Sequence, residues 1–109
     1  MAKKLTNTLS NQDLKALRAV GHRLSPIVIV GGNGLSDTLI EETNRALHDH
    51  ELIKVRIPAG SGEERASCAN ELAQRTKAVV AHHIGRMVLL FRKNPEPNAK
   101  LSNLVRFGL

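Results

Sequence analysis

The sequence predicts an α/β domain in which a mixed four-stranded sheet packs against three helices. Helical and strand periodicities alternate along the chain in the order helix, strand, helix, strand, helix, strand, strand. Strand–helix–strand connections join parallel strands, whereas the last two strands flank Gly85 and form an antiparallel hairpin. With 109 residues, 41% hydrophobic and 24% charged, the chain has the size and composition of one globular domain.

The first predicted helix begins after Ser10 and extends to about Val20. Ser10 is a typical N-cap residue, and Asp13 three positions later completes a capping box. Gly21 ends the helix, and the Ser-Pro pair at 25–26 directs the chain into an extended segment.

The strands 27–30 and 87–91 are apolar on both faces. We therefore expect both to occupy central positions in the sheet, with the first helix covering part of the second face. In the strand 52–57, Lys54 and Arg56 alternate with apolar residues, so one face there meets solvent or a ligand. The remaining predicted elements are a helix over 36–49, a helix over 63–76, and hairpin strands over 78–84 and 86–92.

Residues 1–93 are predicted to form the domain, and residues 94–109 a C-terminal tail. Pro95 and Pro97 interrupt regular structure at the start of this tail. The apolar residues that follow are compatible with a short docking helix or with a loose segment.

The composition favours a cytoplasmic protein without a membrane partner. The longest apolar runs are far shorter than a membrane span, and the first residues lack the apolar segment of a signal peptide. The single cysteine, Cys68, lies in a helical pattern, where a small buried side chain is expected rather than a nucleophile.

The net charge of +6 is unevenly distributed. Segments 1–30 and 61–109 each carry +4, whereas segment 31–60 carries −2. Such a chain suits a polyanion, with nucleic acid first and an acidic membrane surface second. A solvated basic surface without a specific partner is the alternative.

A glycine loop follows the first strand and precedes a helix, an arrangement that exposes backbone N–H groups to an anion. A P-loop would need Gly-Lys-Ser/Thr, but Gly34 is followed by Leu35; the dinucleotide fingerprint would need glycine where Asp37 stands. The G-x-x-G spacing of Gly31 and Gly34 remains, as in the loop that clamps the backbone in KH-type RNA binders. The same spacing also occurs in simple strand-to-helix turns.

Catalytic and metal sites are not predicted. His82 and His83 point to opposite faces of a strand, and His48 and His50 lie about 200° apart on a helix. With two phenylalanines, no Trp and no Tyr, the sheet cannot stack bases as an RRM does, so phosphate contacts are expected to dominate. The acidic pairs Glu41–Glu42 and Glu63–Glu64 are surface neighbours and do not predict two-carboxylate catalysis.

Three stretches, 17–35, 50–55 and 84–92, resemble the CRM domain, and most closely its bacterial single-domain YhbY-type members. The resemblance covers about residues 5–93. It implies a fold similar to the C-terminal domain of translation initiation factor three, RNA binding, association with precursors of the large ribosomal subunit, and no enzymatic activity. The matching RNA-contacting positions are Gly31, Gly32, Asn33 and Gly34 in the loop, and Lys15, Arg18, His22 and Arg23 in an adjoining cationic face.

The expected function is therefore that of a cytoplasmic RNA-binding protein, acting as a monomer in ribosome assembly on large-subunit precursor ribosomal RNA. No cofactor, metal or small-molecule substrate is expected. Two alternatives remain: a protein-interaction adaptor with a basic surface, and an enzyme that acts on a small phosphorylated ligand at the loop.

Overall fold

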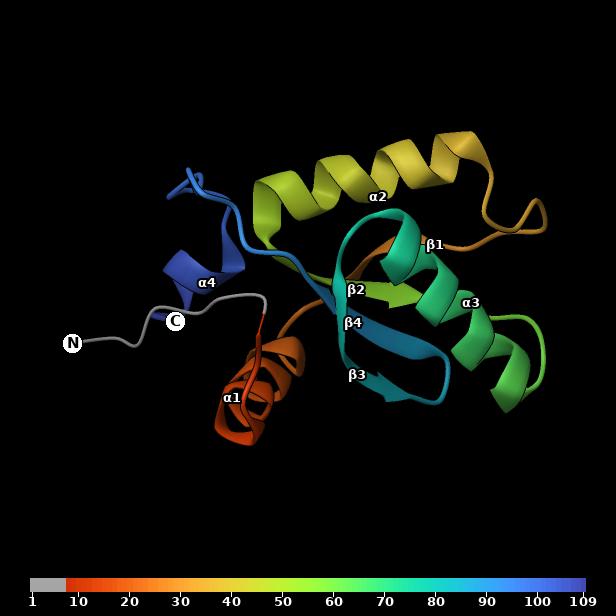
Figure 1. Cartoon of the computed structure of the whole chain (residues 1–109), viewed down its shortest axis with the longest axis horizontal. Helices are drawn as coiled ribbons and strands as arrows, with labels where there is room; N and C mark the ends of the chain where they lie inside the picture. The colour runs from red at the N-terminus through yellow and green to blue at the C-terminus, as the bar shows by residue number, and fades with distance from the viewer. Residues whose placement is uncertain (1–7) are drawn as a thin grey trace.

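The computed structural model describes residues 8–109 and confirms the predicted α/β fold with its mixed four-stranded sheet (Figure 1). Residues 1–7 lie outside the described part, including Lys3 and Lys4, which contribute to the predicted N-terminal charge. The elements are α1 (Asn11–Gly21), β1 (Pro26–Ile29), α2 (Asp37–His50), β2 (Leu52–Arg56), α3 (Gly62–Arg75), β3 (Val79–Ile84), β4 (Met87–Phe91) and a one-turn helix α4 (Asn103–Arg106).

The sheet order is β1-β2-β4-β3. Strands β1 and β2 are parallel, and β4 runs antiparallel to both β2 and β3, which it separates. The predicted hairpin is present, with Gly85 in its turn at a φ of +58°. No helix within the described residues is long and apolar enough to cross a membrane.

Each face of the sheet has its own core. In Figure 1, α1 and α2 lie on opposite sides of the strands. Helices α2 and α3 bury one face, and α1 and the C-terminal segment cover part of the other. The buried residues of the second core are Leu17, Val20, Leu52, Ala81, Leu89, Phe91 and Leu104.

The capping box predicted at the start of the first helix is present. Ser10 Oγ accepts from the N–H of Asp13, whose carboxylate accepts from the N–H of Ser10. Gly21 has a larger role than ending α1, because a Cβ there would lie 2.3 Å from Leu89 Cδ1. Glycine at this position therefore lets α1 approach β4 closely.

The predicted central position is correct for β4 but wrong for β1. Strand β1 is an edge strand that pairs only with β2. Its residues Ile27 and Ile29 are 46% and 55% exposed, because α1 packs over β3 and β2 and leaves this side of β1 open. An apolar strand pattern thus does not require that both faces are covered.

The segment after β4 docks on the sheet, so the docking helix, rather than a loose segment, is present. Glu51, fully buried after α2, accepts hydrogen bonds from the Asn94 N–H at 2.6 Å and from Ser102 Oγ at 2.7 Å. The amide of Asn103 donates to the Leu52 carbonyl at 2.7 Å, and Leu104 completes the second core.

Candidate nucleic-acid interface

Part of the sheet is left uncovered on the side of α1. The strand register places Ile29, Arg56, Met87 and Ile84 opposite one another in a row across all four strands. Residues directly opposite in paired strands share one face of a sheet. These four residues, together with Ile27 and Lys54, form the uncovered surface that we call the open sheet face. It combines exposed apolar side chains with cations.

The G-x-x-G loop lies at the end of β1. It is closed by a hydrogen bond from the Gly34 N–H to the Gly31 carbonyl at 3.0 Å, and only Gly34 adopts a left-handed φ, +61°. Nothing lies within 4 Å of a Cβ built on Gly31 or Gly32. The backbone of these two exposed glycines is therefore open to a ligand, although the fold itself does not require glycine at either position.

A cation near this loop was not identified from the sequence. Arg75, at the end of α3, donates to the Leu35 carbonyl at 3.1 Å and lies 3.8 Å from Asp37 Oδ1. No local motif marks this contact, since Arg75 is 40 residues away from Leu35. Arg75 fixes the chain between the loop and α2.

Helix α1 and the turn after it carry the exposed cations expected from the sequence, but the structure does not bring them next to the loop. The six residue steps from Ser25, after α1, to Gly31 span about 20 Å when extended at about 3.3 Å per residue, and most of this stretch is strand β1. Figure 1 shows the loop at the right-hand end of the molecule and α1 at the lower left. Lys54 and Arg56 lie on the sheet between them. These four exposed basic residues are Lys15, Arg18, His22 and Arg23.

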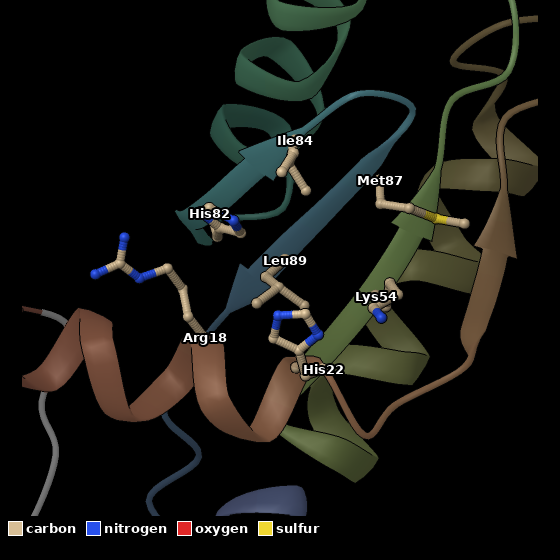
Figure 2. Close-up of a pocket in the computed structure, with 8 residues that line it drawn as sticks. Arg18, His22, Lys54, His82, Ile84, Met87 and Leu89 are labelled. Carbon is tan, nitrogen blue, oxygen red and sulfur yellow. The ribbon is translucent and has the colours of Figure 1, made fainter.

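A hollow of about 130 Å³ lies between α1 and the open sheet face (Figure 2). Arg18 reaches it from α1, His22 from the C-cap of that helix, Lys54 from β2 and His82 from β3. The pKa of His82 is lowered from its ordinary value by desolvation and by the positive charges of Arg18, His22 and His83. Burial is the larger cause of this lowered pKa, and the neighbouring positive charges add to it. The apolar lining consists of Ile84, Met87 and Leu89, with Gly21 at the edge.

A second hollow, of about 260 Å³, lies on the other side of Lys54, which lines both. It brings Arg23 together with Arg106 from the C-terminal segment. Both guanidinium groups lie over the ring of Phe107, at 4.9 and 5.8 Å from its centroid. The position of Arg106 depends on how the C-terminal segment docks, so no local sequence pattern indicates it.

Neither hollow is lined by a carboxylate. Two acidic residues are buried, Asp13 in its capping box and Glu51 beneath the C-terminal segment. The open sheet face is therefore a cationic surface without opposite charges, which suits an anionic ligand. The exposed or partly exposed acids of the described chain are Asp37, Glu41, Glu42 and Asp49 on α2, Glu63, Glu64 and Glu71 on α3, and Glu96.

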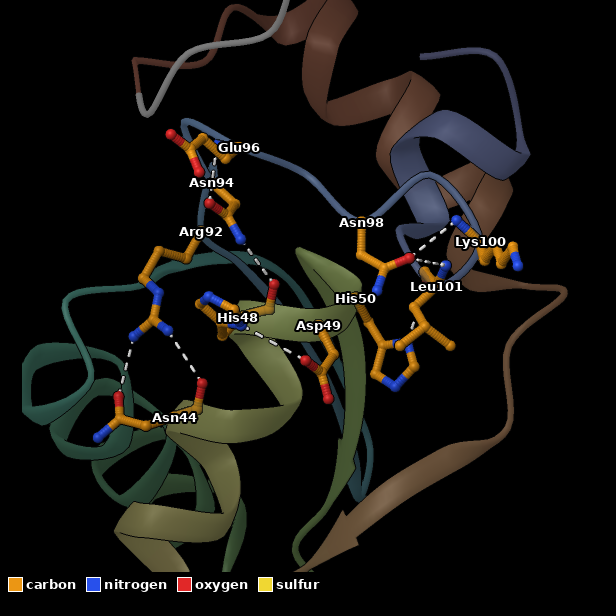
Figure 3. Close-up of polar contacts among 10 residues, drawn as sticks. All are labelled: Asn44, His48, Asp49, His50, Arg92, Asn94, Glu96, Asn98, Lys100 and Leu101. Carbon is orange, nitrogen blue, oxygen red and sulfur yellow. Dashed lines mark hydrogen bonds and ion pairs between the residues drawn. The ribbon is translucent and has the colours of Figure 1, made fainter.

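Polar contacts at the end of α2 involve the imidazole of His50 and the backbone of His48 (Figure 3). His50 Nδ1 lies 2.9 Å from the Leu101 carbonyl, and the His48 carbonyl accepts from Asn94 Nδ2 at 2.9 Å. Arg92 donates to Asn44 in the same region. The His48 and His50 contacts hold the C-terminal segment against α2. Within residues 8–109, no three His, Cys, Asp or Glu side chains form a group suited to a metal ion.

Comparison with known proteins agrees with this architecture. Residues 9–92 match the family model described as the CRS1 / YhbY (CRM) domain. A probable RNA-binding protein of Pseudomonas aeruginosa is 40% identical over 100 residues, covering 92% of this chain and 96% of the relative. An RNA-binding protein of Haemophilus influenzae is 35% identical over 94 residues, covering 86% and 95%.

A solved structure is similar as well. The solution structure of a Staphylococcus aureus protein, described as "a putative RNA binding protein", has a TM-score of 0.72 at 26% identity and covers 82% of this chain and 93% of that one. The resemblance predicted from the sequence is confirmed by the family model. Since that model spans most of the chain and the relatives align over nearly their whole lengths, the chain belongs to the CRS1 / YhbY (CRM) domain family.

Proposed function

We propose that this protein binds RNA through the open sheet face, the G-x-x-G loop and the cations of α1. The observation that carries this proposal is the separation of charge. Both hollows hold cations without a carboxylate, whereas the exposed acids lie mainly on α2 and α3. The names of the relatives, which describe RNA-binding proteins, support the same ligand.

The two ends of the interface bind phosphates in different ways. At the loop, the exposed backbone of Gly31 and Gly32 admits a phosphodiester near the N-terminus of α2, whose dipole favours an anion. At the other end, Lys15, Arg18 and Arg23 act by charge. About 20 Å between them leaves room for several phosphates, which Lys54 and Arg56 neutralise along the way.

The proposed role is binding and not catalysis. The groups that line the two hollows are cations, histidines and apolar or neutral side chains, with no carboxylate to orient a histidine as a base. The pKa of the Cys68 thiol is raised by burial and by the charge of Glu71, which disfavours the thiolate.

A matched pair of arginine variants tests the interface. Arg18→Ala on α1 and Arg45→Ala on α2 each remove one exposed helical arginine, on opposite faces. We expect Arg18→Ala to weaken RNA binding about fivefold to tenfold and to reduce the salt slope by about 0.7, since one phosphate contact is lost. Arg45→Ala should leave both unchanged. The reverse pattern would place RNA on the α2–α3 face.

The finer proposal is that the RNA is large-subunit precursor ribosomal RNA, bound by a cytoplasmic monomer that assists ribosome assembly. Membership of the CRM family supports this role. Crosslinking in cells, followed by sequencing of the bound RNA, tests it. Reads concentrated in large-subunit ribosomal RNA are expected, and reads dispersed over other transcripts would contradict the assembly role while leaving RNA binding intact.

The adaptor alternative uses the same cations for an acidic protein partner. Adding bulk RNA to a pull-down separates the two functions. Under the proposed function, Arg18→Ala reduces RNA capture and no protein remains bound once RNA is digested. A protein partner that survives digestion and competes with RNA would favour the adaptor.

A further inference from the structure

We propose that the hollow between α1 and the sheet receives the base of one unpaired RNA nucleotide. This inference rests on the proposed function, because it assumes that RNA lies along the open sheet face. It adds that the protein contacts one base as well as phosphates, and that its target contains an unpaired nucleotide.

The floor of the hollow is apolar and of suitable size. Leu89 is 4% exposed and forms the base of the hollow, while Ile84 is 66% exposed at its rim beside Met87. An apolar cavity of about 150 Å³ in another protein holds benzene. The volume here, about 130 Å³ and open to solvent, is therefore adequate for one flat ring.

The packing of α1 sets the shape of the hollow. Gly21 lines it, and a Cβ at this position would lie 2.3 and 2.7 Å from the two methyl carbons of Leu89. Any larger residue would therefore have to displace Leu89 or move α1. The close approach at Gly21 leaves Leu89 as a packed apolar surface on which a ring can lie.

The rim supplies the groups that a nucleotide needs. Arg18 and Lys54 line opposite sides of the hollow (Figure 2), and no carboxylate lies among the residues that line it. A guanidinium can lie against the face of a base, and an ammonium can neutralise the attached phosphate. The ring of His82, which also lines the hollow, can donate a hydrogen bond to the base or to the attached phosphate.

An unpaired base fits these features better than a duplex. In an RNA helix the bases are stacked and paired, so only backbone and groove edges reach a protein surface. A hollow with an apolar floor gives no advantage to phosphate alone. Its combination with a carboxylate-free cationic rim matches a nucleotide whose base is turned outward.

Methionine-methyl NMR gives a direct readout, because the chain holds only two methionines, Met1 and Met87. The probes are a hexa-adenylate and the same ribose-phosphate chain without its bases. We expect the hexa-adenylate to move the Met87 methyl signal upfield by the ring current of a base. The abasic chain should leave that signal in place and bind about fivefold more weakly, the lower limit for one stacked base.

A matched pair of variants locates the base. Met87→Ala and Ile29→Ala each shorten an apolar side chain in the same row of the sheet, but only Met87 lines the hollow. We expect Met87→Ala to abolish most of the fivefold difference between the two probes, whereas Ile29→Ala should preserve it. Equal loss in both variants would mean that the base lies elsewhere on the face.

The outcomes separate the inference from the proposed function. Equal, salt-dependent binding of the abasic and intact chains, without a shift at Met87, would overturn the base site and leave RNA binding standing. Failure of both chains to bind would overturn both. If adenosine monophosphate shifts Met87 at the same micromolar concentrations as the RNA, the hollow is a site for free nucleotides and the inference is wrong.

Discussion

At the scale of single residues, the loop shows that neighbouring glycines have different roles. Gly34 has a left-handed φ of +61°, which other residues adopt only at a cost. Gly31 and Gly32 have no left-handed φ and no atoms near the position of a Cβ. Their lack of a side chain is thus not needed for folding, which makes the loop suitable for separating stability from binding.

We expect Gly32→Ala to leave the free energy of unfolding within about 0.5 kcal/mol of the original, and to weaken RNA binding because its methyl group holds the phosphodiester away. Gly34→Ala should lower the free energy of unfolding by about 1 kcal/mol or more. Urea denaturation and filter binding measure the two effects. Unchanged RNA affinity in Gly32→Ala would place the phosphodiester elsewhere.

His82 connects proton binding to RNA binding. In the free protein, desolvation, Arg18, His22 and His83 lower its pKa, so the neutral ring predominates at pH 7. A bound phosphate favours the protonated form and raises the pKa towards its ordinary value. RNA binding therefore takes up protons, and its affinity should rise as the pH falls below about 6.5.

Isothermal titration at pH 5.5 and 7.5 checks this expectation, and His82→Gln should reduce the difference in affinity between the two values. An affinity that is the same at both pH values would show that phosphate does not approach this histidine.

At the scale of elements, the C-terminal segment is held by an unusual helix end. Glu51 caps α2 with a left-handed φ of +61°, where glycine or asparagine is the usual choice. Its carboxylate is fully buried and accepts from Asn94 and Ser102, with Lys93 Nζ at 3.4 Å. The backbone cost is offset by these contacts, which join α2 to the C-terminal segment.

Glu51→Ala should lower the free energy of unfolding by about 3 kcal/mol, since it leaves the Asn94 N–H and the Ser102 hydroxyl without their partner. Amide exchange should show faster opening of α4 than of β4. Asp49→Ala, at a half-exposed site two residues earlier, is the control and should cost little. Equal stability of the two variants would show that Glu51 does not hold the segment.

The elements themselves were largely predictable, because serine caps and periodic apolar residues act locally. Ser10 and Ser36 start α1 and α2 as expected. The edge position of β1 was not predictable from its composition, because it depends on how far α1 extends across the sheet. The distance between the loop and the α1 cations, and the position of Arg106, likewise depend on tertiary packing.

At the scale of the whole molecule, the net charge of +6 understates the local field. The cations that line the two hollows lie on one face of the described chain, whereas most of its exposed acids lie on α2 and α3. About three to five phosphate contacts on a single strand should give a slope of log K against log salt of about −2 to −4. Fluorescence anisotropy between 50 and 300 mM salt measures this slope, and binding that does not change with salt would refute the mechanism.

The edge position of β1 also bears on how the protein behaves at high concentration. One edge of this strand has no hydrogen-bonded neighbour, and its side chains Ile27 and Ile29 are exposed on the open sheet face. Two copies could therefore associate along this edge. Repulsion between the cationic faces around Lys54 and Arg56 opposes that association. Salt that releases RNA also screens this repulsion, and the colloidal stability of the free protein should therefore decline over the same range of ionic strength.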